Sequence, residues 1–143
     1  MIENLSHPLN VTPPRSVLQP KLIPVVLKLK NTYGVWQKHL IHFPKANRFT
    51  LGTKIDDIFL LSIEYCFLAS YSSLGDKLTY INKATSRIDL LKLLLLLAFE
   101  NKDIDNKKYL ELSEMLAEVG RMLGGWRKET IQKTSHEISE KKK

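Results

Sequence analysis

The amino-acid sequence predicts an all-α protein, an antiparallel up-down four-helix bundle within one domain. Apolar residues recur at alternating intervals of three and four residues in several segments, which is the repeat of a helix that buries one side. All six prolines precede residue 45, so long helices are permitted beyond it. The length of 143 residues suits one domain better than two.

The chain divides into three predicted parts. Residues 1–21 hold four of the six prolines together with Ser, Asn and Thr, which predicts a flexible, Pro-rich arm. Residues 22–127 carry the helical periodicity and form the predicted bundle. Residues 128–143 end in Glu-Lys-Lys-Lys and are predicted to be a polar, basic tail that frays.

The first predicted helix runs from about Pro24 to His42. Proline suits the first turn, where its missing N–H costs nothing, and Pro44 ends the helix. Its apolar residues follow the 4, 3, 4, 3, 4, 3 spacing of a helix packed in a bundle: Leu22, Val26, Leu29, Tyr33, Trp36, Leu40 and Phe43.

The second predicted helix, residues 51–72, follows a predicted loop over residues 43–50. Thr50 is a candidate N-cap, and Thr53 is a second candidate start signal. Asp56 would stand near the positive end of the helix dipole, in a capping role. Apolar residues cover more than one face: Ile55, Ile58, Phe59, Leu60, Leu61, Tyr65, Cys66, Phe67, Leu68 and Ala69.

The third predicted helix, residues 77–100, is almost entirely leucine between Leu90 and Leu97, so its inner and outer sides are both apolar. A monomeric bundle needs an apolar stripe over only about a third of each helix. The second and third helices exceed that, which favours an oligomer in which the outer faces meet another subunit. The alternative is a broad, leucine-rich core.

The fourth predicted helix, residues 107–126, follows a loop over residues 101–106. Gly120 and Gly124 lie inside it, where each glycine costs about 1 kcal/mol relative to alanine. Close approach of a neighbouring helix is one reason for them, and a helix end at Gly124 is the alternative. Trp126 is expected to cover the end of the core.

The formal net charge is +7, and its distribution is uneven. Residues 1–54 hold eight Lys and Arg against the single acid Glu3, whereas the rest of the chain balances. A surface of one sign favours a polyanionic partner such as nucleic acid, and the alternative is a solvated helix face. The acid-free segment supplies the candidate contacts Lys28, Lys30, Lys38, Lys45, Arg48 and Lys54.

Other classes of site have little support. Cys66 reads as a small core residue, and His39 and His42 as solvated side chains, so we expect no metal and no cofactor. Helical-bundle ribonucleases of the HEPN type place His four to six residues after Arg, whereas Arg127 precedes His136 by nine; we expect no enzyme. The longest apolar run has seven residues, so we expect no membrane span and a cytoplasmic protein.

Two segments and one lysine carry a resemblance to a known family. The segments are Phe-Pro-Lys-Ala-Asn-Arg-Phe-Thr-Leu-Gly, residues 43–52, and Leu-Ala-Glu-Val-Gly-Arg-Met-Leu-Gly-Gly-Trp, residues 116–126. With Lys92 between them, they resemble the four-helix-bundle family of the accessory variability determinants of diversity-generating retroelements. That family also includes proteins encoded in intervening sequences of ribosomal RNA genes.

The resemblance implies a non-catalytic homopentamer of bundles, shaped as a barrel and encoded by a prokaryote or a phage. Its partners would be a reverse transcriptase and template RNA, with DNA or an RNA/DNA hybrid as alternatives. The ribosomal branch implies instead a structural or interaction protein without a reverse transcriptase. Carried over to this chain, the basic positions are Lys45, Arg48, Lys92 and Arg121, and the structural ones are Gly52, Gly120, Gly124 and Trp126.

Two of these positions have local alternatives, and the family pattern is broken one turn after Lys92. Arg48 could cap loop carbonyls, and Arg121 follows Glu118 at an ion-pair spacing. Many relatives have a second basic residue one turn after Lys92, where this chain has Leu96. The basic surface is therefore expected mainly on the first helix.

Overall fold

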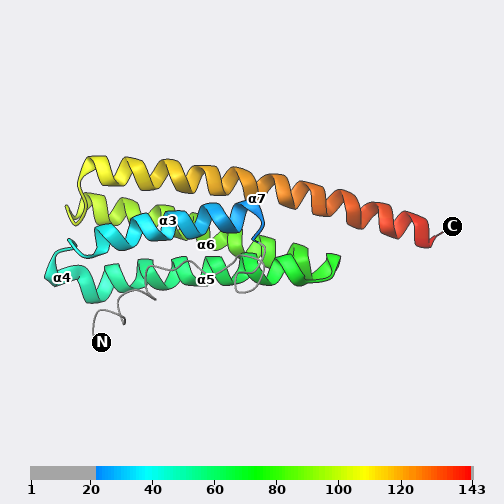
Figure 1. The fold of residues 1–143 in the computed structure, drawn as a ribbon, viewed down its shortest axis with the longest axis horizontal. Coiled ribbons are helices and arrows are strands. Elements are labelled where there is room, and N and C mark those ends of the chain that lie inside the picture. The colour runs from blue at the N-terminus through cyan, green and yellow to red at the C-terminus, as the bar shows by residue number, and fades with distance from the viewer. Residues whose placement is uncertain (1–21, 143) are drawn as a thin grey trace, which may run out of the picture.

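The computed structural model describes residues 22–142, so the predicted arm lies outside the described residues. Within that range the protein is all-helical, and four long helices run up and down beside one another (Figure 1): α3 (Pro24–Leu40), α5 (Thr53–Tyr71), α6 (Leu74–Glu100) and α7 (Asn106–Lys141). The predicted four-helix bundle is confirmed. Its assembly into a pentamer stays a prediction.

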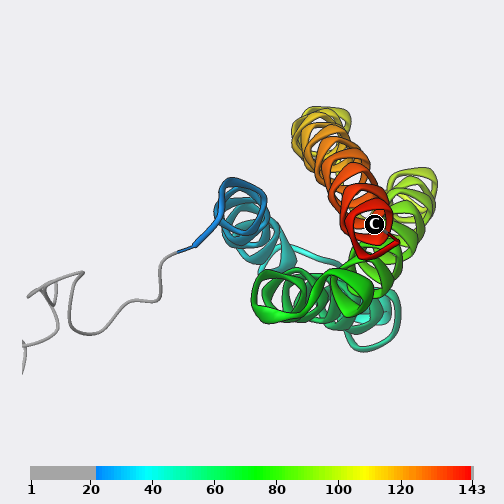
Figure 2. The same ribbon diagram turned by 90° about the vertical axis from the view of Figure 1, so that its right-hand side faces the viewer.

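The helices form a four-cornered arrangement, seen end-on in Figure 2. α6 packs between α5 and α7, and α3 closes the bundle by contacting both α5 and α7. Helix α3 therefore stands diagonally across from α6. This placement decides which charged residues share a face.

The predicted apolar spacing accounts for the core. Leu29 and Trp36 of α3 and Leu116 of α7 are fully buried in the same core. The Trp36 ring lies 5.7 Å from the ring of Phe43 and 6.1 Å from that of Phe59, measured between centroids. These aromatic contacts hold the end of α3 against the start of α5.

The segment before α5 differs from the predicted loop. Residues 45–52 form a short helix α4 (Lys45–Asn47) and a π-helical turn η1 (Arg48–Gly52) that leads directly into α5. Thr50 is therefore not an N-cap, and its hydroxyl donates to the carbonyl of Asn47 at 3.4 Å. The Thr53 hydroxyl donates to the carbonyl of Arg48 at 3.2 Å, which satisfies a backbone group in the wider turn.

Helix α6 begins at Leu74, three residues earlier than predicted. The backbone of Ser73 is extended and ends the turn after α5, so the helix starts at the next residue. Asp105 is the N-cap of α7, and its carboxylate accepts from the backbone N–H of Lys108 at 2.8 Å. The loop between α6 and α7 places Lys102 at φ 63°, in the left-handed region.

Helix α7 corrects two expectations. It continues through Gly124 to Lys141, so the glycine does not end the helix and residues 128–141 are helical rather than frayed. The segment holds no proline, and pairs four residues apart support it: Lys133 with Glu129 at 2.8 Å and Lys141 with Glu137 at 3.3 Å. Figure 1 shows this end of α7 projecting beyond the other helices.

Candidate nucleic-acid interface

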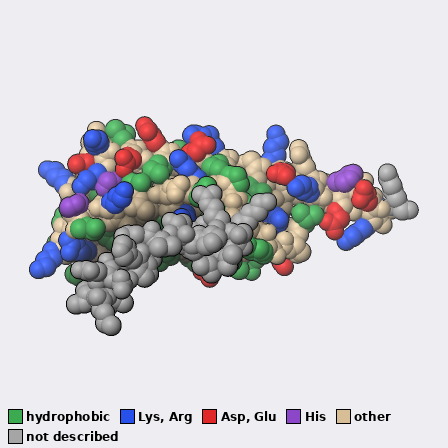
Figure 3. All heavy atoms as spheres, viewed as in Figure 1, with side chains coloured by type: hydrophobic (Ala, Val, Ile, Leu, Met, Phe, Trp, Pro, Cys, Tyr) green, Lys and Arg blue, Asp and Glu red, His purple; other side chains and the backbone are tan. Residues whose placement is uncertain are grey.

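The acid-free segment forms α3 and the turn before α5. Residues 24–54 hold six Lys and Arg and no Asp or Glu. Four of these cations are exposed, namely Lys30, Lys38, Lys45 and Lys54, whereas Lys28 and Arg48 are half-buried. Figure 3 shows basic side chains gathered at the end of the bundle where α4 lies. The candidate surface is therefore α3 and its C-terminal end.

Arg48 has a structural role at this end. Its Nη2 donates to the carbonyls of Ile41, at 3.1 Å, and Phe43, at 3.0 Å. These carbonyls follow the last turn of α3 and lack helical partners, and the positive guanidinium also suits the negative end of the helix dipole. The geometry therefore supports the alternative in which Arg48 caps loop carbonyls.

A groove missed by the sequence reasoning opens beside Arg48. It has a volume of about 660 Å³ and is lined by Gln37, Leu40, Ile41, Arg48, Phe49 and Thr53. Two apolar side chains stand in solvent at its rim: Phe49 is 75% exposed and Ile41 is 69% exposed. One feature of the sequence could have indicated that Phe49 is exposed. It lies between Arg48 and Thr50 in the acid-free segment, and not at one of the apolar positions spaced three and four residues apart.

Polar contacts fix the position of this end. The Asn47 amide donates to both carboxylate oxygens of Asp103, at 2.9 and 3.1 Å, and so ties α4 to the loop before α7. His39 lies 3.1 Å from Glu111 of α7, through Nε2 and Oε1, and its side chain is only 15% exposed. The prediction that His39 is solvated is therefore wrong, because α3 packs against α7 at this point.

Asp56 also departs from its predicted role. Its carboxylate accepts from the indole N–H of Trp36 at 3.1 Å instead of capping α5. Burial, together with a hydrogen bond to Asp56, raises the pKa of the Tyr33 phenol above 10.0. Asp56 is the first acid after the acid-free residues 24–54, and its carboxylate is therefore engaged by side chains inside the bundle.

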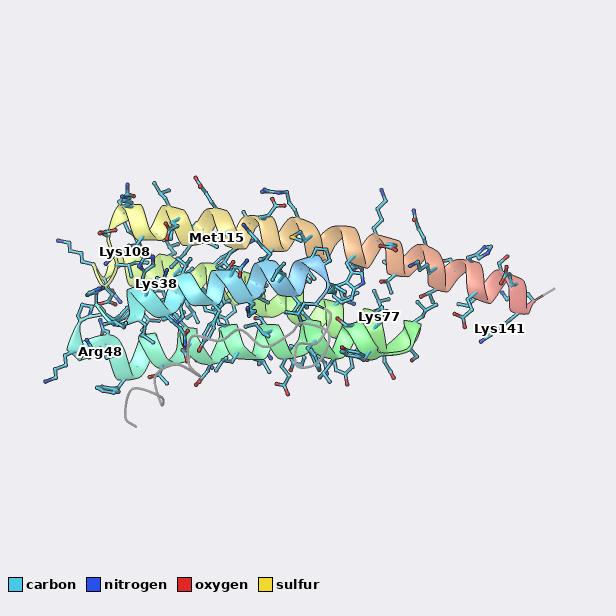
Figure 4. The ribbon with its side chains drawn as sticks, in the orientation of Figure 1. Lys38, Arg48, Lys77, Lys108, Met115 and Lys141 are labelled. Carbon is cyan, nitrogen blue, oxygen red and sulfur yellow. The ribbon has the colours of Figure 1, made fainter. Side chains whose placement is uncertain are left out.

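Lysines from the other half of the chain reach the same end. Lys102, Lys107 and Lys108 belong to the loop before α7 and to its first turn, and Figure 4 shows Lys108 at the same end of the bundle as Lys38. Acids accompany them in residues 100–111: Glu100, Asp103, Asp105 and Glu111. This loop adds no net positive charge, so the excess stays with residues 24–54.

The remaining predicted cations lie elsewhere. Lys92 projects from α6, diagonally across from α3, with its Nζ 3.9 Å from Asp89. Arg121 of α7 is paired with Glu118, its Nε donating at 3.0 Å. The structure therefore places Lys92 on the helix diagonally across from the basic residues of α3, whereas Arg121 lies on α7, which packs against α3, and is engaged by Glu118.

The predicted structural glycines have different surroundings. A Cβ on Gly52 would lie 3.0 Å from Leu40 Cδ1, so this buried glycine leaves room for α3. A Cβ on Gly120 would meet only the Nζ of Lys92, at 3.4 Å, and one on Gly124 would meet nothing within 4 Å. The predicted close approach of a neighbouring helix at Gly120 and Gly124 is therefore wrong within the chain. Trp126 packs against the core as expected.

The second apolar face predicted for the middle helices is present. On α5 the exposed residues include Leu60, Phe67 and Tyr71, and the last two rings lie 4.9 Å apart. On α6 the exposed residues include Leu93 and Leu97. These side chains extend outward and are not part of a broad core.

Within residues 22–142, no three His, Cys, Asp or Glu side chains are grouped so as to hold a metal ion. Over the same residues, no helix combines the length and hydrophobicity needed to cross a membrane. Cys66 is fully buried in the core, as predicted.

The fold and this surface define a small four-helix-bundle protein with a basic, solvent-exposed face. Residues 28–130 match the model of a family described as bAvd-like, more than two thirds of the sequence. The chain belongs to the bAvd-like family, which confirms the resemblance carried by its two sequence segments. A comparison with curated proteins finds no match.

Proposed function

We propose that the protein is a non-catalytic accessory protein of a diversity-generating retroelement. It binds a reverse transcriptase and the template RNA through its basic surface and so supports mutagenic synthesis of complementary DNA. Membership of the bAvd-like family supports this function. The observation that carries it is the set of exposed cations on α3 and the turn before α5, a segment that holds no acid of its own.

The chemistry of this surface suits a phosphate backbone. Lys30, Lys38 and Lys45 are exposed, and within residues 22–142 none of them forms an ion pair. Lysine contacts to phosphates release counterions, so they give an affinity that falls steeply with salt and depends little on sequence. Binding of a template RNA irrespective of its sequence needs affinity of this kind.

The proposal includes a homopentamer. The exposed side chains on α5 and α6, among them Phe67, Tyr71 and Leu93, supply apolar surface for contacts between subunits. Burial of this surface would leave α3, which lies diagonally across from α6, available to RNA. Light scattering after size exclusion tests the subunit number.

A matched pair of triple variants tests the RNA surface. Lys30→Ala, Lys38→Ala and Lys45→Ala remove three charges from the basic surface, whereas Lys128→Ala, Lys133→Ala and Lys142→Ala remove three from the projecting part of α7. We expect the first triple variant to weaken RNA binding and to flatten its salt dependence by about two units of log–log slope. The second should bind like wild type. If both triple variants bind RNA equally well, the basic surface is not where RNA binds.

Co-purification tests the partner. The full-length chain, expressed with the reverse transcriptase of a neighbouring retroelement, should purify with it at moderate salt. A protein that forms the oligomer but retains no reverse transcriptase would instead favour the ribosomal intervening-sequence type, a structural or interaction protein.

A further inference from the structure

We propose that the groove beside Arg48 binds an unpaired base of a single-stranded nucleic acid, with the Phe49 ring as the stacking surface. This inference rests on the proposed function and specifies the form of nucleic acid that the basic surface takes. The lining residues come from both α3 and η1, so the groove exists only in the folded bundle.

The backbone at Phe49 is fixed by its neighbours, and its ring stands in solvent. It lies in the π-helical turn η1, between residues whose side chains are bonded to the backbone: Arg48 to the carbonyls of Ile41 and Phe43, and Thr50 to that of Asn47. Leaving a phenylalanine 75% exposed forgoes the burial that its neighbour Phe43 achieves. Because the backbone that carries the ring is already ordered, stacking of a planar partner costs only the freedom of the side chain.

Charge decides between partners for this groove. The cations Lys38, Lys45 and Arg48 lie at the same end of the bundle, and the segment that contains them has no acid. A phosphate chain matches the cations while its base matches the ring, whereas an apolar helix would match only Leu40, Ile41 and Phe49 and would leave the cations without a partner. The polar lining by Gln37 and Thr53 also suits a base edge.

The form of the nucleic acid follows from the stacking. In a duplex, both faces of each base are already covered by its neighbours, so no face is free for Phe49. Unpaired bases in loops and single strands stack on aromatic side chains, usually beside a basic groove that follows the backbone. A groove volume of about 660 Å³ lies within the usual range of about 300–1,000 Å³ for small-ligand sites.

The test compares full-length variants by fluorescence anisotropy, with a labelled 16-nucleotide single strand and the corresponding RNA duplex. We expect Phe49→Ala and Phe49→Leu to weaken single-strand binding by about 5- to 150-fold and to leave duplex binding unchanged. Phe49→Trp should retain binding. Ile138→Ala, which removes an exposed apolar side chain from the projecting end of α7, is the control and should bind the single strand like wild type.

Three other outcomes would refute the stacking, the inference as a whole, or RNA binding itself. If Phe49→Ala or Phe49→Leu binds the single strand like wild type, stacking is refuted, and the salt-dependent binding that remains still supports the proposed function. If Phe49→Ala changes the subunit number in light scattering, the ring belongs to a contact between copies, and the inference is refuted. If the wild-type protein binds neither probe at low salt, RNA binding itself is refuted.

Discussion

The side-chain amide of Asn47 donates to both carboxylate oxygens of Asp103, at 2.9 and 3.1 Å. The two residues are 56 positions apart, and their contact joins α4 to the loop between α6 and α7. Asp103 is only 8% exposed, so its carboxylate depends on this donor. The contact thereby fixes the end of the bundle that carries Arg48 and Phe49.

Asn47→Ala should lower the free energy of unfolding by about 1–3 kcal/mol, because it leaves a buried carboxylate without its side-chain partner. Urea unfolding followed by circular dichroism measures the change. Asn31→Ala, at an exposed position of α3, is the control and should shift it by no more than about 0.5 kcal/mol. Equal stabilities for the two variants would show that the contact contributes nothing.

Arg48 and Lys45 should separate stability from binding. Arg48→Ala removes two charge-assisted hydrogen bonds to carbonyls and should cost about 1–3 kcal/mol of stability. Lys45→Ala removes an exposed side chain and should leave stability within about 0.5 kcal/mol. RNA titrations at several salt concentrations should show the Lys45 variant losing about one phosphate contact. A stability loss for Lys45→Ala as large as that for Arg48→Ala would contradict this division.

Gly124→Ala should stabilise the protein by about 0.5–1 kcal/mol. The residue is exposed within α7, an added Cβ would meet nothing within 4 Å, and alanine is the better helix former. Thermal unfolding and light scattering should be measured together. A smaller oligomer in this variant would show that another subunit approaches closely at Gly124.

Gly52→Ala provides the contrasting case. Its Cβ would lie 3.0 Å from Leu40 Cδ1, so the gain in helix propensity is offset by crowding. We expect Gly52→Ala to be less stable than Gly124→Ala in the same unfolding experiment. The reverse order would show that α3 moves away from η1 without cost.

Burial raises the pKa of the Cys66 thiol from 9.0 to about 12. Below pH 9 the thiol is protonated in both the folded and the unfolded chain. Between pH 9 and 12 only the unfolded chain releases the proton, so the stability from this group is lost as the pH rises. At pH 10 the loss should reach about 1.4 kcal/mol.

Comparison of wild type with Cys66→Ala at pH 7 and pH 10 isolates this effect. The cavity left by alanine lowers stability at both pH values, whereas only wild type should lose the additional amount at pH 10. A thiol reagent should also react slowly with the native protein at pH 8 and rapidly in guanidinium. Fast native labelling would show that the α5 core opens readily.

Most of the bundle could be predicted because periodicity is a local property. The spacing of Leu29, Trp36 and Leu116 with their neighbours marks the side of each helix that is buried. The predictions of helix ends were less accurate, because the predicted loop at residues 45–52 is helical and α7 continues through Gly124. A glycine permits a helix end but does not impose one, and the uninterrupted polar segment after it can continue as a helix.

The candidate site could be predicted only in part. The acid-free charge of residues 24–54 is visible in the sequence, as is the resemblance of residues 43–52 and 116–126. The use of Arg48 to cap α3 depends on how α3 and η1 turn toward each other, and two readings of it were open until that geometry was known.

The sequence by itself determined the helical class, the buried seams, the location of the excess positive charge and the family. Only the tertiary structure decided that Arg48 bonds to carbonyls at the end of α3, that Lys92 lies diagonally across from the cations of α3, and that Phe49 lines a groove. The reason is physical: periodicity and charge count are properties of neighbouring residues, whereas hydrogen bonds and grooves arise where helices distant in sequence meet.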